Sequence, residues 1–309
     1  MLRRSLLRLA NDPRVRSRVE ATPGTDELVG RFVAGQTTAE AITVADDLIG
    51  KGLTVTFDHL GENATSEAAV QASCQGYLDL LAQVGERDWA ASIDVSVKLS
   101  AMGLQLGRAG EDLAHAFTRD ICEAADKVGA TVTVDMEDHT TTDATLSIVE
   151  RLRREFPSTG AVLQAYLRRT ESDARALATA GSRVRLCKGA YSEPAGVAWQ
   201  AHHEIDRAYV RCLRVLMEGE GYPMVATHDP RLIEIAAALA KKLGRTPDSF
   251  EYQMLHGVRP IEQRRLVDIG NQCRVYLPYG VDWYGYFTRR VAEKPATASL
   301  FARQLVGRR

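Results

Sequence analysis

The alternation of short apolar runs with longer stretches of helical periodicity constrains this chain more than any other feature. Eight such runs, most of them rich in valine, are separated by gaps of about 20 to 40 residues, each long enough for a crossover helix. Continuous apolar runs are typical of parallel strands that are buried on both faces. The expected strands are Leu53–Phe57, Asp94–Leu99, Thr131–Met136, Ala161–Tyr166, Arg183–Cys187, Met224–Thr227, Phe250–Leu255 and Arg274–Leu277. Eight βα units in 309 residues predict the α/β class and a (βα)8 barrel.

The residues before the first expected strand have helical spacing and predict additional N-terminal helices. These segments lie around Leu6–Leu9, Asp26–Val33 and Ala39–Ile49. After the first strand, Thr65 or Ser66 is suited to cap the start of the next helix. We therefore expect a helical extension at residues 1–50 and a barrel catalytic domain at residues 51–309.

Composition excludes several classes of protein. The formal net charge is −1, so nothing points to a nucleic-acid partner. The five cysteines are scattered and form no CxxC pair, which is typical of a reduced, intracellular protein. No apolar stretch approaches the roughly 20 residues of a membrane span. Arg8 interrupts the apolar N-terminus, which is better suited to a short amphipathic helix, with surface contact left open.

Polar residues end or follow the expected strands, where a barrel enzyme carries its chemistry. The charged residues that we place at the mouth are Asp58, Glu62, Lys98, Asp135, Arg185, Lys188, Glu251, Arg289, Arg290 and Glu293. Charged groups there are costly unless they are paired or used. Their mixture of signs suits an anionic or zwitterionic small molecule, and the alternative for each residue is a satisfied buried group or a rim charge.

Near the C-terminus, Tyr286, Arg289, Arg290 and Glu293 recur at the spacing of one helix face, if residues 282–294 are helical. Two guanidiniums beside a phenol form a fork for a carboxylate, just after the last expected strand. The alternative is a solvated charged face, which this spacing often represents.

Several chemistries remain open at this point. Lys188-Gly-Ala lets the backbone approach a phosphate closely, but no GxGxxG or GxxxxGK[ST] motif occurs. Four histidines lie near expected strand ends without metal-ligand spacing, so we expect no metal site. A Schiff-base lyase that uses Lys98 or Lys188 is a second enzyme class. A non-catalytic barrel that binds amino acids is a third possibility.

Several ordered motifs resemble proline dehydrogenase in its small, monofunctional bacterial form. They run from Leu53 to Phe301 and comprise Asp58-His-Leu-Gly-Glu62, Ser96-Val-Lys98-Leu-Ser100, Gln164-Ala-Tyr166, Arg185-Leu-Cys-Lys188-Gly-Ala-Tyr191, Ala226-Thr-His228, Glu251-Tyr-Gln253-Met-Leu-His-Gly257 and Tyr286-Phe-Thr-Arg289-Arg290. The resemblance implies a distorted (βα)8 TIM barrel that binds FAD non-covalently and oxidises L-proline to Δ1-pyrroline-5-carboxylate. It also implies a membrane quinone as acceptor, a link to a separate pyrroline-5-carboxylate dehydrogenase, and a cytoplasmic or peripheral membrane location.

The resemblance assigns roles to individual residues. Asp135 and Arg185 take the catalytic positions. Substrate binding falls on Lys98, Leu255, Tyr276, Tyr286, Arg289 and Arg290. Flavin contacts fall on Met136, Gln164, Arg185, Lys188, Gly189, Ala190, Thr227, His228 and Gln253.

Three further residues are expected to support or gate the site. We expect Asp58 to keep Lys98 charged by pairing with it. We expect Glu62 to latch onto Arg289, because the first and last strands are neighbours in a closed barrel. Glu293 is the third supporting residue.

Overall fold

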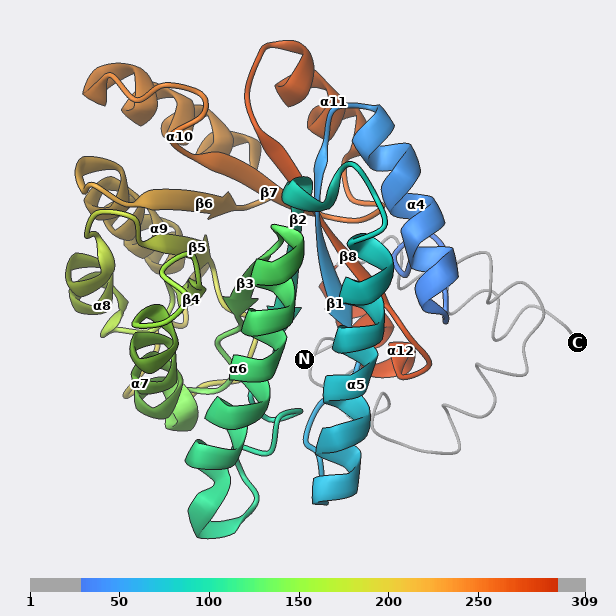
Figure 1. Cartoon of the computed structure of the whole chain (residues 1–309). Coiled ribbons are helices and arrows are strands. Elements are labelled where there is room, and N and C mark those ends of the chain that lie inside the picture. Colours follow the sequence, from blue (N-terminus) through green and yellow to red (C-terminus); the bar gives the residue numbers. More distant parts are fainter. Residues whose placement is uncertain (1–28, 294–309) are drawn as a thin grey trace, which may run out of the picture.

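The computed structural model describes residues 29–293, without the side chains of Arg289 and residues 291–293. Eight parallel strands form a closed barrel in chain order, and β8 pairs with β1 (Figure 1). The strands are β1 (Thr54–His59), β2 (Ile93–Val97), β3 (Thr131–Val134), β4 (Gly160–Gln164), β5 (Arg183–Cys187), β6 (Tyr222–Ala226), β7 (Glu251–Leu255) and β8 (Cys273–Tyr279). Each expected strand overlaps one of them, so the predicted (βα)8 barrel is confirmed.

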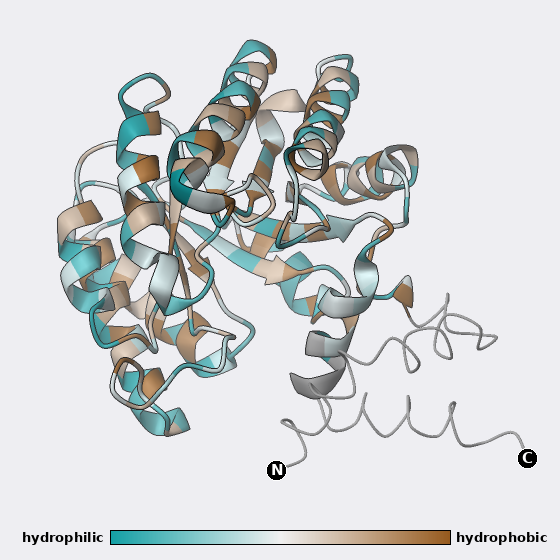
Figure 2. Ribbon diagram, turned by 90° about the horizontal axis from the view of Figure 1, so that it is seen from below, coloured by the Kyte–Doolittle hydropathy of each residue, from teal (hydrophilic) through white to brown (hydrophobic). Residues whose placement is uncertain are grey.

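Helices surround the barrel and carry alternating hydrophobic and hydrophilic bands (Figures 1 and 2). They are α4 (Thr38–Gly50), α5 (Glu67–Val84), α6 (Gly110–Val128), α7 (Thr142–Arg153), α8 (Thr170–Leu177), α9 (His202–Glu218), α10 (Pro230–Leu243), α11 (Pro260–Asp268) and α12 (Trp283–Glu293). Short 3-10 turns lie at Ala90–Ser92, Gly107–Ala109 and His139–Thr141. Ser66 caps α5 by accepting a hydrogen bond from the Ala69 amide, as expected. Helix α12 confirms the helix that was expected to carry the arginine pair.

The segment before α4 attaches to the mouth of the barrel. The Ala34 amide donates to the Pro278 carbonyl at 2.8 Å, and the Gly280 amide donates to the Gly35 carbonyl at 3.0 Å. Phe32 packs against Phe287 of α12, with ring centroids 6.3 Å apart, inside a small second core. This core fixes α12 relative to the barrel.

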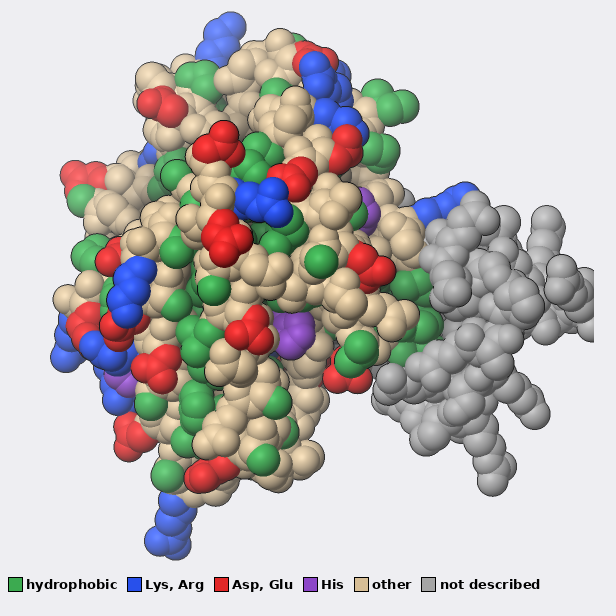
Figure 3. Space-filling view, turned by 45° about the vertical axis from the view of Figure 1, so that its right-hand side comes forward, with side chains coloured by type: hydrophobic (Ala, Val, Ile, Leu, Met, Phe, Trp, Pro, Cys, Tyr) green, Lys and Arg blue, Asp and Glu red, His purple; other side chains and the backbone are tan. Residues whose placement is uncertain are grey.

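Among the expected N-terminal helices, the one at Ala39–Ile49 is confirmed as α4. The expected helix around Leu6–Leu9 lies outside the described residues, and so do residues 26–28 of the helix expected at Asp26–Val33, whose described part forms a turn. Within residues 29–293, no helix combines the length and hydrophobicity that crossing a bilayer requires. On the face shown in Figure 3, acidic and basic side chains are interspersed.

The inner and outer faces of the strands differ in chemistry. On β1, Val55 and Phe57 pack outward into the main hydrophobic core, whereas Thr56 and Asp58 lie on the opposite face. Register partners repeat this alternation around the barrel, for example Thr56 opposite Asp94 and Asp58 opposite Ser96. The expectation that the strands are apolar on both faces is therefore wrong for the inner face. The interior is instead filled by ion pairs, which a closed barrel shields from water.

Candidate active site

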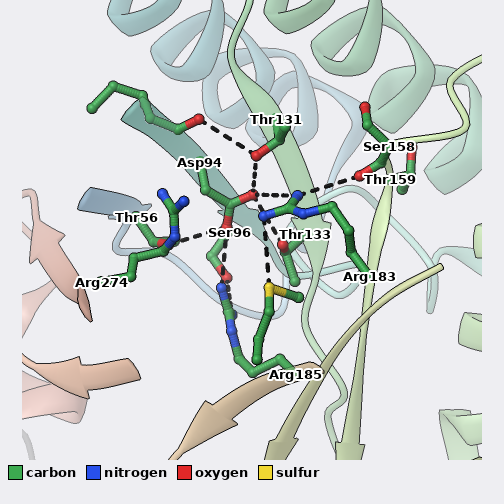
Figure 4. Close-up of polar contacts among 12 residues, drawn as sticks. Thr56, Asp94, Ser96, Thr131, Thr133, Ser158, Thr159, Arg183, Arg185 and Arg274 are labelled. Carbon is green, nitrogen blue, oxygen red and sulfur yellow. Dashed lines mark hydrogen bonds and ion pairs between the residues drawn. The ribbon is translucent and has the colours of Figure 1, made fainter. Parts of the chain in front are cut away.

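The end of the barrel interior where the strands begin, which we call the closed end, is organised around Asp94 of β2 (Figure 4). Its carboxylate is fully buried and forms ion pairs with Arg183 at 3.3 Å and Arg185 at 3.1 Å. Burial alone would raise the pKa of Asp94, but Arg183, Arg185 and Arg274 outweigh burial and hold that pKa below its usual value. Asp94 therefore stays charged.

Arg185 of β5 joins the closed end to the mouth. Its Nη1 donates to Asp135 Oδ1 at 2.8 Å and to Ser96 Oγ at 2.8 Å, and its Nε donates to Gln253 Oε1 at 2.6 Å. The Arg185 side chain is 5 % exposed. The two predicted catalytic residues, Asp135 and Arg185, are therefore in direct contact.

The mouth begins one layer above, where Lys98 follows β2. Lys98 Nζ donates to Asp58 Oδ1 at 2.5 Å and lies 3.8 Å from Asp135 Oδ2. Burial by itself lowers the pKa of Lys98, but the Asp58 and Asp135 carboxylates outweigh it, so that pKa is raised. The contact expected between Asp58 and Lys98 is present, and it favours a permanently charged lysine.

Tyr276 of β8 completes this cluster. Its hydroxyl donates to Asp135 Oδ2 at 2.9 Å, and the Arg185 guanidinium lies 5.3 Å from the centre of its ring. Burial, together with the Asp135 carboxylate, raises the pKa of the Tyr276 phenol, so it stays protonated and donates. Leu255 is the register partner of Tyr276 on β7, and it packs against the core that contains Tyr286. The three side chains expected around the substrate ring therefore gather at one side of the mouth.

Helix α12 brings the predicted fork to this side. Tyr286 is buried, Arg290 is half-buried, and the Arg290 guanidinium lies 5.3 Å from the centre of the Tyr286 ring. The side chains of Arg289 and Glu293 lie outside the described residues. The expected contact between Glu62 and Arg289 therefore stays a prediction, although β1 and β8 are neighbours as it requires.

The positions expected to contact the flavin come from consecutive strands, β3 to β7. Met136 follows β3, Gln164 ends β4, and Lys188 to Ala190 follow β5. Thr227 and His228 follow β6, and Gln253 lies within β7. They therefore follow the barrel from β3, which neighbours β2 and Lys98, round to β7, which also carries Leu255, and Gln253 lies in the barrel interior.

The segment after β5 has room only for glycine at its second position. Gly189 has φ +109°, and a Cβ atom there would lie 2.2 Å from the Tyr166 ring. Next to it, Lys188 Nζ pairs with Asp206 at 2.6 Å and Asp229 at 3.2 Å. Hydrogen bonds from Arg231 and Lys188 lower the pKa of Asp229 to about 2. The glycine makes this turn tight, and the lysine beside it is paired with two carboxylates.

Sequence reasoning missed the roles of three residues that organise the mouth, namely Glu137, Ser100 and Ser96. Glu137 accepts hydrogen bonds from the Ser100 amide at 2.9 Å and hydroxyl at 2.6 Å, and its carbonyl accepts from Gln164 Nε2 at 2.6 Å. Ser100 also accepts from the Asn63 and Ala64 amides, which fixes the loop that carries Glu62. Burial raises the pKa of Glu137. Its place two residues after Asp135, just beyond a strand, was an available signal.

Ser96 was quoted only as part of a motif, yet it donates to Asp135 at 2.8 Å. Glu251, in contrast, was placed wrongly. It is the first residue of β7 and therefore lies at the closed end, where it accepts from Arg274 Nε at 2.8 Å. Parallel strands start at the closed end and finish at the mouth, which fixes its position.

Comparison with known proteins identifies the family of this chain. The family model described as "Proline dehydrogenase" matches residues 41–303. "Proline dehydrogenase 2" of Bacillus subtilis (strain 168) is 36% identical over 273 residues, which is 88% of each chain. "Proline dehydrogenase" of Deinococcus radiodurans is 38% identical over 303 residues, covering 97% of this chain and 96% of the relative.

Solved structures share the fold. Proline utilization A (PutA) from Bdellovibrio bacteriovorus, inactivated by N-propargylglycine, superposes with a TM-score of 0.80 at 24% identity, over 92% of this chain. The chain spans only 34% of that protein's length. The agreement in fold, the extent of the family match and the identity to full-length relatives lead to one conclusion: this chain belongs to the proline dehydrogenase family.

Proposed function

We propose that this protein is a proline dehydrogenase that uses non-covalently bound FAD to oxidise L-proline to Δ1-pyrroline-5-carboxylate, the first step of proline catabolism. The observation that carries the proposal is family membership over most of the chain, at 36% and 38% identity to the relatives named above. The charge of the mouth supports it, because Lys98 and Arg290 suit the carboxylate of a zwitterionic amino acid.

Binding of proline is assigned to the side of the mouth formed by β2, β7, β8 and α12. Lys98, Arg289 and Arg290 hold the carboxylate, and Leu255, Tyr276 and Tyr286 surround the ring. A substrate that is fixed at one end and along its faces keeps C5 in one place, and this orientation supplies much of the rate enhancement. The pairing of Lys98 with Asp58 supports this role, since the lysine is charged before the substrate arrives.

The residues that the resemblance assigns to the flavin, on β3 to β7 and the loops after them, fit a flavin nucleotide. The tight turn at Gly189 allows the backbone of residues 189–190 to approach a phosphate, and Lys188 supplies a cation beside it. Met136 is apolar, and Gln164 and Gln253 supply amide groups. Bound FAD would supply the oxidant, accepting a hydride from C5 of proline at its N5 atom. The flavin contacts also include Arg185, Thr227, His228 and Ala190.

Arg185 and Asp135 are the proposed catalytic pair. The Arg185 cation stabilises negative charge that develops next to it during the reaction. Asp135 accepts hydrogen bonds from Arg185 and Tyr276, so it holds both side chains in the geometry that the substrate meets. Ser96 supports the same carboxylate oxygen that Arg185 contacts.

We assign a membrane quinone as the electron acceptor, and a cytoplasmic location with peripheral contact at the membrane. A separate pyrroline-5-carboxylate dehydrogenase would then consume the product. We also assign residues 1–50 to a helical extension and residues 51–309 to the barrel domain.

The acceptor assignment is tested by turnover with different acceptors. Turnover with a soluble quinone analogue should greatly exceed turnover with oxygen, and NAD should support none. Proline-dependent reduction of NAD by the purified chain would overturn the acceptor assignment.

Two other functions compete with this one. A Schiff-base lyase needs a neutral lysine, but the paired carboxylates raise the pKa of Lys98. Lys188 also pairs with two carboxylates. A binding barrel without catalysis needs no flavin. Trapping of a substrate adduct by borohydride would favour the lyase, and a colourless protein that binds proline would favour the binding barrel.

The proposed function is tested by anaerobic titration of the purified, yellow protein with L-proline. The visible absorbance of the flavin should fall as proline is added, and it should return when a quinone analogue is supplied. D-proline serves as the matched control, because it presents its carboxylate on the opposite side of the ring. A flavin that keeps its full absorbance in the presence of L-proline would contradict the proposal.

A further inference from the structure

We propose that two buried carboxylates at the closed end of the barrel, Asp94 and Glu251, are positioning residues that hold the Arg185 guanidinium in a single orientation. The inference rests on the proposed role of Arg185 beside the flavin. Neither carboxylate reaches the mouth, and each acts on Arg185 from below. They would extend the active site through the full depth of the barrel.

Asp94 acts directly, and its two oxygens have separate partners (Figure 4). Oδ2 accepts from Arg185 Nη2 at 3.1 Å and from the Thr56 hydroxyl at 3.1 Å. Oδ1 accepts from the hydroxyls of Thr131 at 2.8 Å and Thr133 at 3.0 Å, and from Arg183 at 3.3 Å. Because Oδ1 is held by two strands, β3 and β5, the carboxylate cannot rotate away from Arg185.

Glu251 acts through Gln253. The Gln253 amide donates from Nε2 to Glu251 Oε1 at 2.5 Å, and its Oε1 accepts from Arg185 Nε at 2.6 Å. An amide has one donating end and one accepting end, so the carboxylate decides which end faces Arg185. Glu251 is held in turn by Arg274 Nε at 2.8 Å. The carboxylate therefore ensures that Arg185 meets an acceptor and not a second donor.

Together these contacts constrain all three nitrogens of the guanidinium. Asp94 binds Nη2, Gln253 binds Nε, and Asp135 with Ser96 binds Nη1. Arg185 is 4% exposed, Glu251 is 1% exposed and Asp94 has no exposed surface, so water cannot replace the partners on the closed-end side of Arg185. A catalytic cation needs such support, because small errors in its position weaken its effect on the reacting atoms. A network that only closed the barrel would not need to end on an arginine that contacts Asp135 at the mouth.

The test is a double-mutant cycle with Asp94→Asn and Arg185→Lys, read in the FAD-loaded enzyme. The first readout is kcat for proline. The second is the flavin midpoint potential, which is measured by chemical reduction without proline. We expect Asp94→Asn to lower kcat by about tenfold, the loss of one charge-assisted contact, while KM changes by less than about threefold. In the Arg185→Lys background, Asp94→Asn should lower kcat by less than about twofold. The shift that Asp94→Asn causes in the flavin midpoint potential should also be smaller in that background.

Thr131→Val is the matched control, because Thr133 and Arg183 still hold Oδ1 after the change, and both partners of Oδ2 remain. We expect it to lower the melting temperature but to leave kcat and the potential close to those of the wild type. Effects of Asp94→Asn and Arg185→Lys that multiply in the double variant would overturn the proposal. So would an Asp94→Asn variant with wild-type kcat and potential, since the carboxylate would then serve the fold alone.

Glu251→Gln gives an independent cycle if Asp94→Asn does not fold. Its effect on the potential should also shrink in the Arg185→Lys background, and effects that simply add would count against the proposal. If neither variant folds, the carboxylates are requirements of the barrel and the proposal fails. Bleaching of the wild type by L-proline is measured alongside. A wild type that is not bleached refutes the proposed function, whereas the coupling in the potential still reports on the positioning of Arg185.

Discussion

The closed end and the mouth of this barrel both bury charged side chains, but they stabilise them differently. At the closed end, Asp94 lies among three arginines, and its pKa is held below the usual value. At the mouth, the Ser100 hydroxyl donates a hydrogen bond to Glu137, and burial outweighs this contact and raises the pKa of Glu137. One carboxylate is fully compensated inside the protein, and the other remains sensitive to its surroundings. Charges at the closed end therefore serve stability and positioning, whereas charges at the mouth are available to a ligand.

Arg185 is the residue in which the two regions meet. It contacts Asp94 below and Asp135 above, and Asp135 lies 3.8 Å from Lys98. A change at the closed end can therefore affect the catalytic pair, but it should not affect the carboxylate-binding fork on α12. The predictions below separate these effects.

The largest expected effect is on stability at the closed end. Arg274→Met should leave Glu251 buried without its ion-pair partner, and removing one partner of a buried pair costs about 3–5 kcal/mol of unfolding free energy. Urea denaturation would measure this loss. Arg264→Met is the control, because Arg264 pairs with Asp268 at the surface and should cost less than about 1 kcal/mol. Equal losses in the two variants would remove the distinction between buried and surface pairs.

The next effect is on substrate affinity at the mouth. Arg290→Ala should raise KM for proline by about tenfold to a hundredfold, because it removes a charge-assisted contact that contributes roughly 1.5–3 kcal/mol. Arg290→Lys keeps the charge but not the fork, so its KM should fall between that of the wild type and that of Arg290→Ala. Steady-state kinetics check both variants. Unchanged KM in Arg290→Ala would exclude the fork.

Glu62→Ala should have a smaller effect on ligand retention. An ion pair between Glu62 and Arg289 would close the mouth, and an exposed pair contributes up to about 1 kcal/mol, or about fivefold in affinity. Dissociation constants for proline and for a carboxylate inhibitor should both rise. Glu67→Ala changes an exposed carboxylate in the first turn of α5 and serves as control. Constants that do not move would remove the latch.

The smallest effect concerns pH. Because burial raises the folded-state pKa of Glu137, the folded protein retains this proton at a pH where the unfolded chain has lost it. The contribution of Glu137 to stability is therefore complete below the unfolded pKa of about 4.3 and declines as pH rises through the folded pKa. Urea denaturation over that range should show a smaller decline in Glu137→Gln. In the exposed Glu220→Gln variant, the decline of the unfolding free energy with pH should match that of the wild type. The same decline in Glu137→Gln as in the wild type would contradict this account.

The sequence predicted the barrel well because its signals are local. Short apolar runs, most of them rich in valine, identified all eight strands, and Ser66 and α12 were found where spacing placed them. The interior network was not predictable, because Asp94 meets Arg183 and Arg185 across 89 and 91 residues of sequence, respectively. Such pairs depend on barrel closure and strand register. Glu251 could have been placed correctly from strand direction alone.

The candidate site divides in the same way. Strand-end positions and the family resemblance brought Lys98, Asp135, Arg185 and Tyr276 to notice, and the structure joins them through hydrogen bonds and ion pairs. Ser100 was quoted only within a motif and Glu137 was not singled out, because their role is to connect two loops that are distant in sequence. The roles of the flavin and substrate contacts stay predictions until they are tested by substitution.

The central claim, that the mouth binds substrate and the closed end does not, is tested most directly by ligand affinity. Cyclopentanecarboxylate has the ring and carboxylate of proline but no nitrogen to oxidise, so its dissociation constant can be measured by titration of the flavin spectrum. In Lys98→Met this constant should rise by at least about tenfold, the loss of one charge-assisted contact. In Arg183→Met, which removes a closed-end cation instead, it should stay within about twofold of the wild type, because coupling fades with distance. Equal shifts in the two variants, or no shift in Lys98→Met, would contradict the account.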